Sequence, residues 1–273
     1  MSSRAQMPLG ADGVPPMSSL PHWVVMHVPH DSMIIPEDVR GQFVLNDLDL
    51  DTELLRMTDH HTHQLIASDI PENQVVRAPV SRLVVDVERF EDDDQEKMAE
   101  RGMGAVYSRT HDLRKLRHPM TNGDRQDLLE RFYRPHHKQL QAATDLALSK
   151  FGKAFIIDVH SFPSKPWPYE LDQNLDRPEI CIGTDDFHTP SSLKDAVVNA
   201  FRDDGFIVGV NAPFAGALVP MSQYRKNKAV SAIMLEVRRD LYVDETTGSR
   251  NNSFLQIAQR IRKCFVAALV ETG

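Results

Sequence analysis

Short apolar runs alternate with longer amphipathic segments along this chain, and this alternation limits the folds open to it. The expected strands cover residues 23–28, 83–87, 155–160, 206–210 and 232–237, and the expected helices cover 44–70, 124–150, 193–201 and 253–270. Strands that alternate with helices predict an α/β sheet with helices on both faces. Continuous apolar runs are typical of buried parallel strands. We therefore expect a mostly parallel mixed sheet.

The chain has 273 residues, and no Gly- or Ser-rich linker divides it. We expect one domain over 21–273 after a flexible leader over 1–20, which lacks the apolar segment of a secretion signal. The formal net charge of -8 argues against a nucleic-acid partner. No run approaches the roughly 18 apolar residues of a membrane span. Cys181 and Cys264 lie far apart in apolar contexts, which favours buried thiols and a cytoplasmic location. The sequence does not set the oligomeric state.

In the segment 155–163 a histidine stands at the carboxyl end of an expected strand. An apolar run leads into Asp158, His160 follows one residue later, and a Ser-Phe-Pro turn comes next. In open α/β sheets, ligands and catalytic groups gather outside the carboxyl ends of strands. His160 is therefore a candidate metal ligand, although a histidine that only caps a strand would look the same. His30 follows the first expected strand in a similar setting.

The densest group of possible ligands is Asp59-His60-His61-Thr62-His63. Catalytic zinc sites commonly use three protein ligands from His, Asp or Glu and keep one position for water. This group, with the two strand-end histidines, could supply such a set, and Asp59, His61 and His63 compete for the third place. The alternative is a polar helix face. The remaining histidines are expected at the surface or in packing: His22, His111, His118, His136, His137 and His188.

Glu236 lies inside the apolar run 233–237, where a carboxylate is costly to bury unless it is paired. It is either an ion-pair partner of an arginine or a functional carboxylate with a raised pKa. Arg82 and Arg89 flank the expected 83–87 strand. Arginine can bind a substrate carboxylate through two parallel hydrogen bonds. The alternative for both arginines is a surface ion pair with the acidic run 91–94.

Several motifs occur together in one order: 28–32 with Ile35-Pro36, 59–63, 81–89, 158–163, 182–185, and 235–236 through 242–245. With these motifs the chain resembles the N-formylglutamate amidohydrolase family from about residue 22 to its end. The resemblance implies a fold similar to the zinc carboxypeptidases and aspartoacylase. In those carboxypeptidase relatives, the positions of His160 and Glu236 supply a zinc ligand and the catalytic glutamate.

The resemblance also implies a full site. One Zn²⁺ per chain would be held by His30, Asp59 and His160, with His61 or His63 as alternates for Asp59. Glu236 would be the catalytic base. The residues expected to bind a small carboxylated N-acyl substrate are Arg89, Arg82, Asn211 and Tyr224.

The expected function is that of a zinc-dependent amidohydrolase acting on an N-acyl amino acid such as N-formylglutamate. Two alternatives stay open. One is a zinc carboxypeptidase or deacylase acting on peptide or cell-wall fragments. The other is a non-catalytic metal-binding protein that retains the fold.

The chain departs from the family's usual pattern in several places. Glu88 replaces a neutral amide beside Arg89, and Val237-Arg238-Arg239 replaces Met-Ser-Gln after Glu236. Further departures are Asp31-Ser32, His60 and His63. We therefore expect an intact metal site with an altered substrate pocket.

Overall fold

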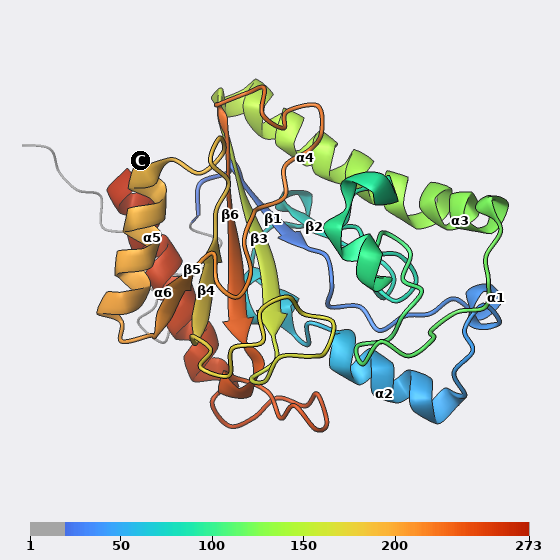
Figure 1. The fold of residues 1–273 in the computed structure, drawn as a ribbon. Coiled ribbons are helices and arrows are strands. Elements are labelled where there is room, and N and C mark those ends of the chain that lie inside the picture. Colours follow the sequence, from blue (N-terminus) through green and yellow to red (C-terminus); the bar gives the residue numbers. More distant parts are fainter. Residues whose placement is uncertain (1–19, 273) are drawn as a thin grey trace, which may run out of the picture.

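The computed structural model describes residues 20–272 (Figure 1), so nearly all of the expected leader over 1–20 lies outside the described residues. A six-stranded sheet has the order β2-β1-β3-β6-β4-β5. Its strands are β1 (Val24–Val28), β2 (Val75–Arg77), β3 (Ala154–Phe162), β4 (Ile180–Gly183), β5 (Val208–Val210) and β6 (Val230–Arg238). β2, β1, β3 and β6 run parallel, whereas β4 pairs with β6 in the antiparallel sense and with β5 in parallel. The expected mostly parallel mixed sheet is confirmed.

Helices cover both faces of the sheet, as expected (Figure 1). The helices are α1 (Glu37–Arg40), α2 (Asp47–Met57), α3 (Asn122–Leu128), α4 (Arg134–Phe151), α5 (Ser191–Asp203) and α6 (Phe254–Thr272). α5 and α6 share a hydrophobic core with one face, and α4 packs on the other. The predicted stop after the long helix is also present, because Gly152 ends α4 with a left-handed φ of 69°.

A second core lies beside the sheet, under α1, α2 and α3. The expected strand over 83–87 was wrong: this segment forms turns whose apolar side chains are buried in that core. Part of its backbone is hydrogen-bonded to a side chain and not to a neighbouring strand. The Arg117 guanidinium donates hydrogen bonds to the carbonyls of Leu83 and Val84. An apolar run therefore marked burial here and not a strand.

Near the carboxyl ends of the central strands, apolar side chains point to one face of the sheet and polar side chains to the other. In β3, Ile157 and Val159 enter the core shared with α5 and α6. Asp158 and His160 are also buried but lie on the opposite face, because successive strand residues point to opposite sides. Glu236 in β6 and His27 in β1 share this second face with them. Polar groups thus gather at the carboxyl ends of β1, β3 and β6.

Two further findings concern the cysteines and the helices. Cys181 and Cys264 are buried free thiols, as expected. None of the helices over residues 20–272 is long and apolar enough to cross a membrane.

Candidate active site

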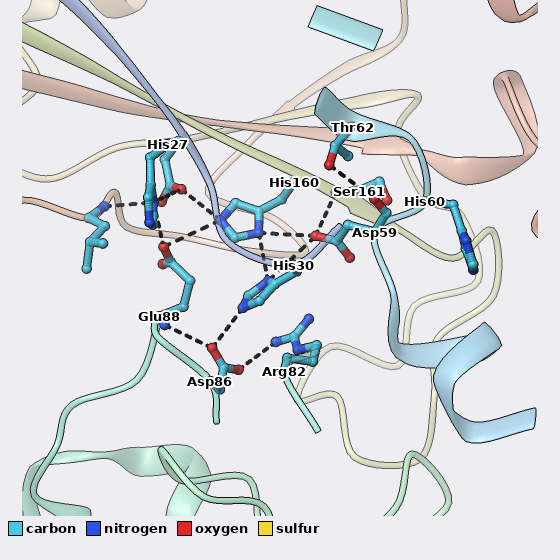
Figure 2. A network of polar contacts seen from close by, with 12 residues as sticks. His27, His30, Asp59, His60, Thr62, Arg82, Asp86, Glu88, His160 and Ser161 are labelled. Carbon is cyan, nitrogen blue, oxygen red and sulfur yellow. Dashed lines mark hydrogen bonds and ion pairs between the residues drawn. The ribbon is translucent and has the colours of Figure 1, made fainter. Parts of the chain in front are cut away.

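Three side chains from distant parts of the sequence converge at the carboxyl end of the sheet (Figure 2). His30 follows β1 by two residues, Asp59 follows the end of α2, and His160 belongs to β3. The backbone N–H of Asp59 donates to the carbonyl of His30 at 2.9 Å, which ties the end of α2 to the end of β1. All three side chains are buried.

The facing atoms of this group form a small triangle. His30 Nδ1 lies 3.2 Å from His160 Nδ1, and Asp59 Oδ2 lies 3.6 Å from His30 Nδ1 and 3.3 Å from His160 Nδ1. Zinc bound tetrahedrally at about 2.0–2.2 Å holds its ligand atoms roughly 3.3–3.6 Å apart. The spacing and the two-imidazole, one-carboxylate donor set therefore fit a zinc ion.

The outer nitrogens of both histidines are held by carboxylates. His30 Nε2 lies 2.7 Å from Asp86 Oδ1, and His160 Nε2 lies 3.0 Å from Asp158 Oδ1. Each Nε2 must carry a proton to donate to its carboxylate, so in the neutral rings both Nδ1 atoms present lone pairs. Three electron-rich atoms then face one another, and a cation between them would stabilise this arrangement.

The other oxygen of Asp59 is bound by a buried arginine. Arg239 Nη2 donates to Asp59 Oδ1 at 2.8 Å, and its Nε donates to the hydroxyl of Ser161 at 3.1 Å. Burial alone would raise the pKa of Asp59, but His160, His30 and Arg239 hold it well below its usual range. Asp59 is therefore ionised at neutral pH. Arg239 was not predicted as a site residue, because it follows a strand without any local signal.

Asp86 contacts both His30 of the candidate metal site and the neighbouring Arg82. Its Oδ1 faces His30, while its Oδ2 accepts hydrogen bonds from Arg82 Nη2 at 2.9 Å and from the Tyr107 hydroxyl. Although burial opposes ionisation, His30 and Arg82 keep the pKa of Asp86 well below its usual range. Asp86 was not predicted as a site residue. A carboxylate inside an apolar run was the available signal, the same one that singled out Glu236.

The alternates for Asp59 lie elsewhere. His61 Nε2 contacts the carbonyl of Gly248 at 3.0 Å, and His63 begins the next helical turn near Asp31. Neither joins the group of described residues whose ligand atoms converge with those of His30 and His160. Figure 2 shows the neighbouring His60 turned away from that group.

Glu236 lies beside this group. It is the register partner of His160 across β3 and β6, and it lines the same cavity. Its Oε2 is buried and has no hydrogen bond from the described residues. Burial raises the pKa of Glu236 to about 8, although His160 acts in the opposite direction. Because no described residue binds this buried oxygen, the geometry favours a functional carboxylate over an ion pair with an arginine.

A cavity of about 590 Å³ opens over the site and is lined by His30, Asp59, His160 and Glu236, among others. Arg82, Arg89 and Tyr224 also line it. The sequence alternatives for Arg89 do not form: Glu91 pairs with Arg134, and Arg89 Nε lies 3.6 Å from Asp86 Oδ2.

The structure does not bring the fourth expected substrate residue to this cavity. Asn211 is exposed, and its side-chain amide binds Thr184 through both its oxygen and its nitrogen. It closes the turn after β5 and is absent from the described residues that line the cavity.

The mixed sheet and the buried His–Asp group at its carboxyl edge define an α/β protein with a candidate metal-binding active site. The sequence pattern of the N-formylglutamate amidohydrolase family matches residues 23–243, and the chain therefore belongs to that family. Membership indicates a hydrolase that acts on amides.

Solved structures show the same fold. An N-formylglutamate amidohydrolase from Ralstonia eutropha JMP134 superposes with a TM-score of 0.76 at 22% identity, over 91% of this chain and 92% of that one. A gene product of Agrobacterium tumefaciens gives a TM-score of 0.69 at 18% identity, over 94% of each chain. A comparison with curated protein sequences found no match.

Proposed function

We propose that this protein is a zinc-dependent amidohydrolase that cleaves the amide bond of a small N-acyl amino acid such as N-formylglutamate. The observation that carries the proposal is the convergence of His30 Nδ1, His160 Nδ1 and Asp59 Oδ2 within 3.6 Å of one another. One Zn²⁺ per chain at this position would leave a coordination site open, as catalytic zinc sites do. A non-catalytic protein with a structural zinc would be expected to close that position with a fourth ligand.

Zinc in such a site acts as a Lewis acid that polarises a carbonyl and lowers the pKa of water towards ~7. With zinc bound, Glu236 would accept a proton from the attacking water and return it to the nitrogen of the leaving amine. Asp86 and Asp158 hold the two imidazole rings in the orientation that presents Nδ1, and Arg239 holds Asp59.

The substrate assignment rests on charge and size. Arg89 and Arg82 line the cavity and supply guanidinium groups suited to a carboxylate. Arg82 already binds Asp86 and the Tyr107 hydroxyl, so Arg89 is the better candidate for substrate contact. A cavity of about 590 Å³ is of the size that small ligands occupy. The buried free thiols fit the proposed cytoplasmic location.

The proposal is tested by a substrate panel. Zinc-loaded protein would be assayed on N-formylglutamate, other N-acyl amino acids, and short peptides, with release of the free amine as the readout. We expect the highest kcat/KM on a small carboxylated N-acyl amino acid. Higher activity on peptides would favour the carboxypeptidase or deacylase alternative. No activity on any amide, in protein shown to hold zinc, would favour the non-catalytic alternative.

A further inference from the structure

A second group of potential metal ligands lies next to the first group. His27, Glu88 and Asp158 bring ligand atoms together on the other side of the His160 ring from Asp59 (Figure 2). His27 Nδ1 lies 2.9 Å from Asp158 Oδ1 and 3.0 Å from Glu88 Oε1. His27 and Asp158 are fully buried, and the Glu88 side chain is only 13% exposed.

This group contains more negative charge than its hydrogen bonds satisfy. Asp158 Oδ1 accepts from His160 Nε2 at 3.0 Å, which is the contact that orients the first site. Glu88 Oε1 is buried and receives no hydrogen bond from the described residues, although it lies in ion-pair range of His27. A buried carboxylate oxygen without a donor is costly unless a cation neutralises it.

The position of the His27 proton decides what faces the carboxylates. His27 Nε2 lies 2.7 Å from His136 Nε2, and His136 Nδ1 is buried without a hydrogen-bond partner among the described residues. If His27 donates to His136, a neutral His27 ring presents its Nδ1 lone pair to Glu88 and Asp158. This arrangement would repeat the convergence of lone pairs found in the first site.

We propose that His27, Glu88 and Asp158 bind a second divalent cation next to the first. One imidazole and two carboxylates suit Zn²⁺, Mn²⁺ or Co²⁺ better than Ca²⁺ or Mg²⁺. His160 stands between the two sites, with Nδ1 facing Asp59 and Nε2 facing Asp158. Glu88 also lines the cavity over the first site, which gives a cation a route in from solvent.

The alternative to a second metal ion is an additional proton on His27. Although burial lowers the pKa of His27, Asp158 and Glu88 raise it to about 9. A doubly protonated His27 would neutralise part of the same charge without any metal. Counting bound metal separates the two states.

The experiment measures zinc per chain in full-length protein. Metal-free protein would be loaded with Zn²⁺, dialysed, and analysed by native mass spectrometry and elemental analysis. We expect about two zinc ions in the wild type, about one in Glu88→Gln and in His27→Gln, and about one in Asp59→Asn. Glu130→Gln, which removes an exposed carboxylate from a surface pair with Arg134, serves as the matched control and should keep two.

Several outcomes would overturn the second site. One zinc in the wild type, lost in Asp59→Asn and kept in Glu88→Gln, would reject it while leaving the proposed function intact. Two zinc ions in both Glu88→Gln and His27→Gln would reject these ligands. No zinc in the wild type would contradict the proposed function as well. Near-ultraviolet circular dichroism checks folding, and Glu88→Gln keeps the test valid if His27→Gln fails to fold.

Discussion

His160 and Glu236 are register partners on the adjacent parallel strands β3 and β6, and both side chains lie on the face opposite the core shared with α5 and α6. Neighbouring strands are separated by about 4.8 Å. The sheet itself therefore fixes the spacing between a proposed metal ligand and the proposed base. Sites built on strands hold such spacings better than sites built on loops.

The base role of Glu236 predicts a selective loss. Glu236→Gln keeps the shape of the side chain but cannot accept a proton. We expect folded protein that still binds zinc, with kcat lower by roughly a hundredfold or more. Steady-state kinetics and metal analysis on the same preparation would check this. Turnover at the wild-type rate would reject the role.

The ligand roles of His30, Asp59 and His160 predict coupled losses. Replacing His160 or His30 with Ala should remove both activity and the zinc of the first site. Chelation of the wild type should abolish hydrolysis, and added Zn²⁺ should restore it. His61→Ala is the matched control, because His61 instead contacts Gly248. Full activity in chelated protein would contradict metal dependence.

Arg89 is predicted to bind the substrate carboxylate. Loss of a charge-assisted hydrogen bond costs about 1.5–3 kcal/mol, so Arg89→Ala should lower kcat/KM on carboxylated substrates by roughly 10- to 100-fold. The same amide without a carboxylate should show a much smaller loss. Equal losses on the two substrates would indicate that Arg89 acts through its contact with Asp86.

Arg239 is predicted to stabilise the fold through Asp59. Arg239→Met leaves a buried carboxylate without its guanidinium, and in metal-free protein this should lower the free energy of unfolding by about 3–5 kcal/mol. Arg114→Met breaks an exposed pair with Asp112 and should cost only about 0–1 kcal/mol. Urea denaturation measures both. Similar effects of the two substitutions would contradict the structural role of Arg239.

Much of this arrangement was predictable from local sequence patterns. Periodicity indicated the central strands and the long helices over 124–150 and 253–270, and the alternation of strands and helices indicated the mixed sheet. The expected helix over 44–70 was wrong in extent, because α2 ends at Met57. The strand-end setting selected His30 and His160, and the cost of a carboxylate in an apolar run selected Glu236. These signals succeed because each depends on burial and direction within a single element.

The rest depended on contacts between distant segments. The 83–87 run looked like a strand, but Arg117 satisfies part of its backbone. β4 is a short antiparallel neighbour of β6 that no periodicity distinguished. Arg239 reaches Asp59 across 180 residues of sequence. Choosing Asp59 over His61 and His63 needed the chain direction after α2, which side-chain chemistry does not specify.

Asp204 links α5 to α6 and gives a pH-dependent prediction. It accepts hydrogen bonds from Arg260 Nε at 2.7 Å and Lys263 Nζ at 2.9 Å. Burial opposes ionisation, but the two cations lower the pKa of Asp204 below its usual value. Because the folded pKa is the lower one, this stabilisation is complete above about pH 4 and disappears as the pH falls through the folded value.

Asp204→Asn should therefore lower the free energy of unfolding by about 1 kcal/mol at neutral pH. The difference from wild type should shrink below about pH 4. Denaturation curves across this range would show it, and a difference that grows on acidification would contradict the assigned sign.

Diffraction from zinc-loaded crystals at the zinc absorption edge tests the central claim most directly. We expect an anomalous peak about 2.0–2.2 Å from each of His30 Nδ1, His160 Nδ1 and Asp59 Oδ2. A crystal that contains zinc but shows no peak there, with His30 and His160 hydrogen-bonded to each other, would contradict it.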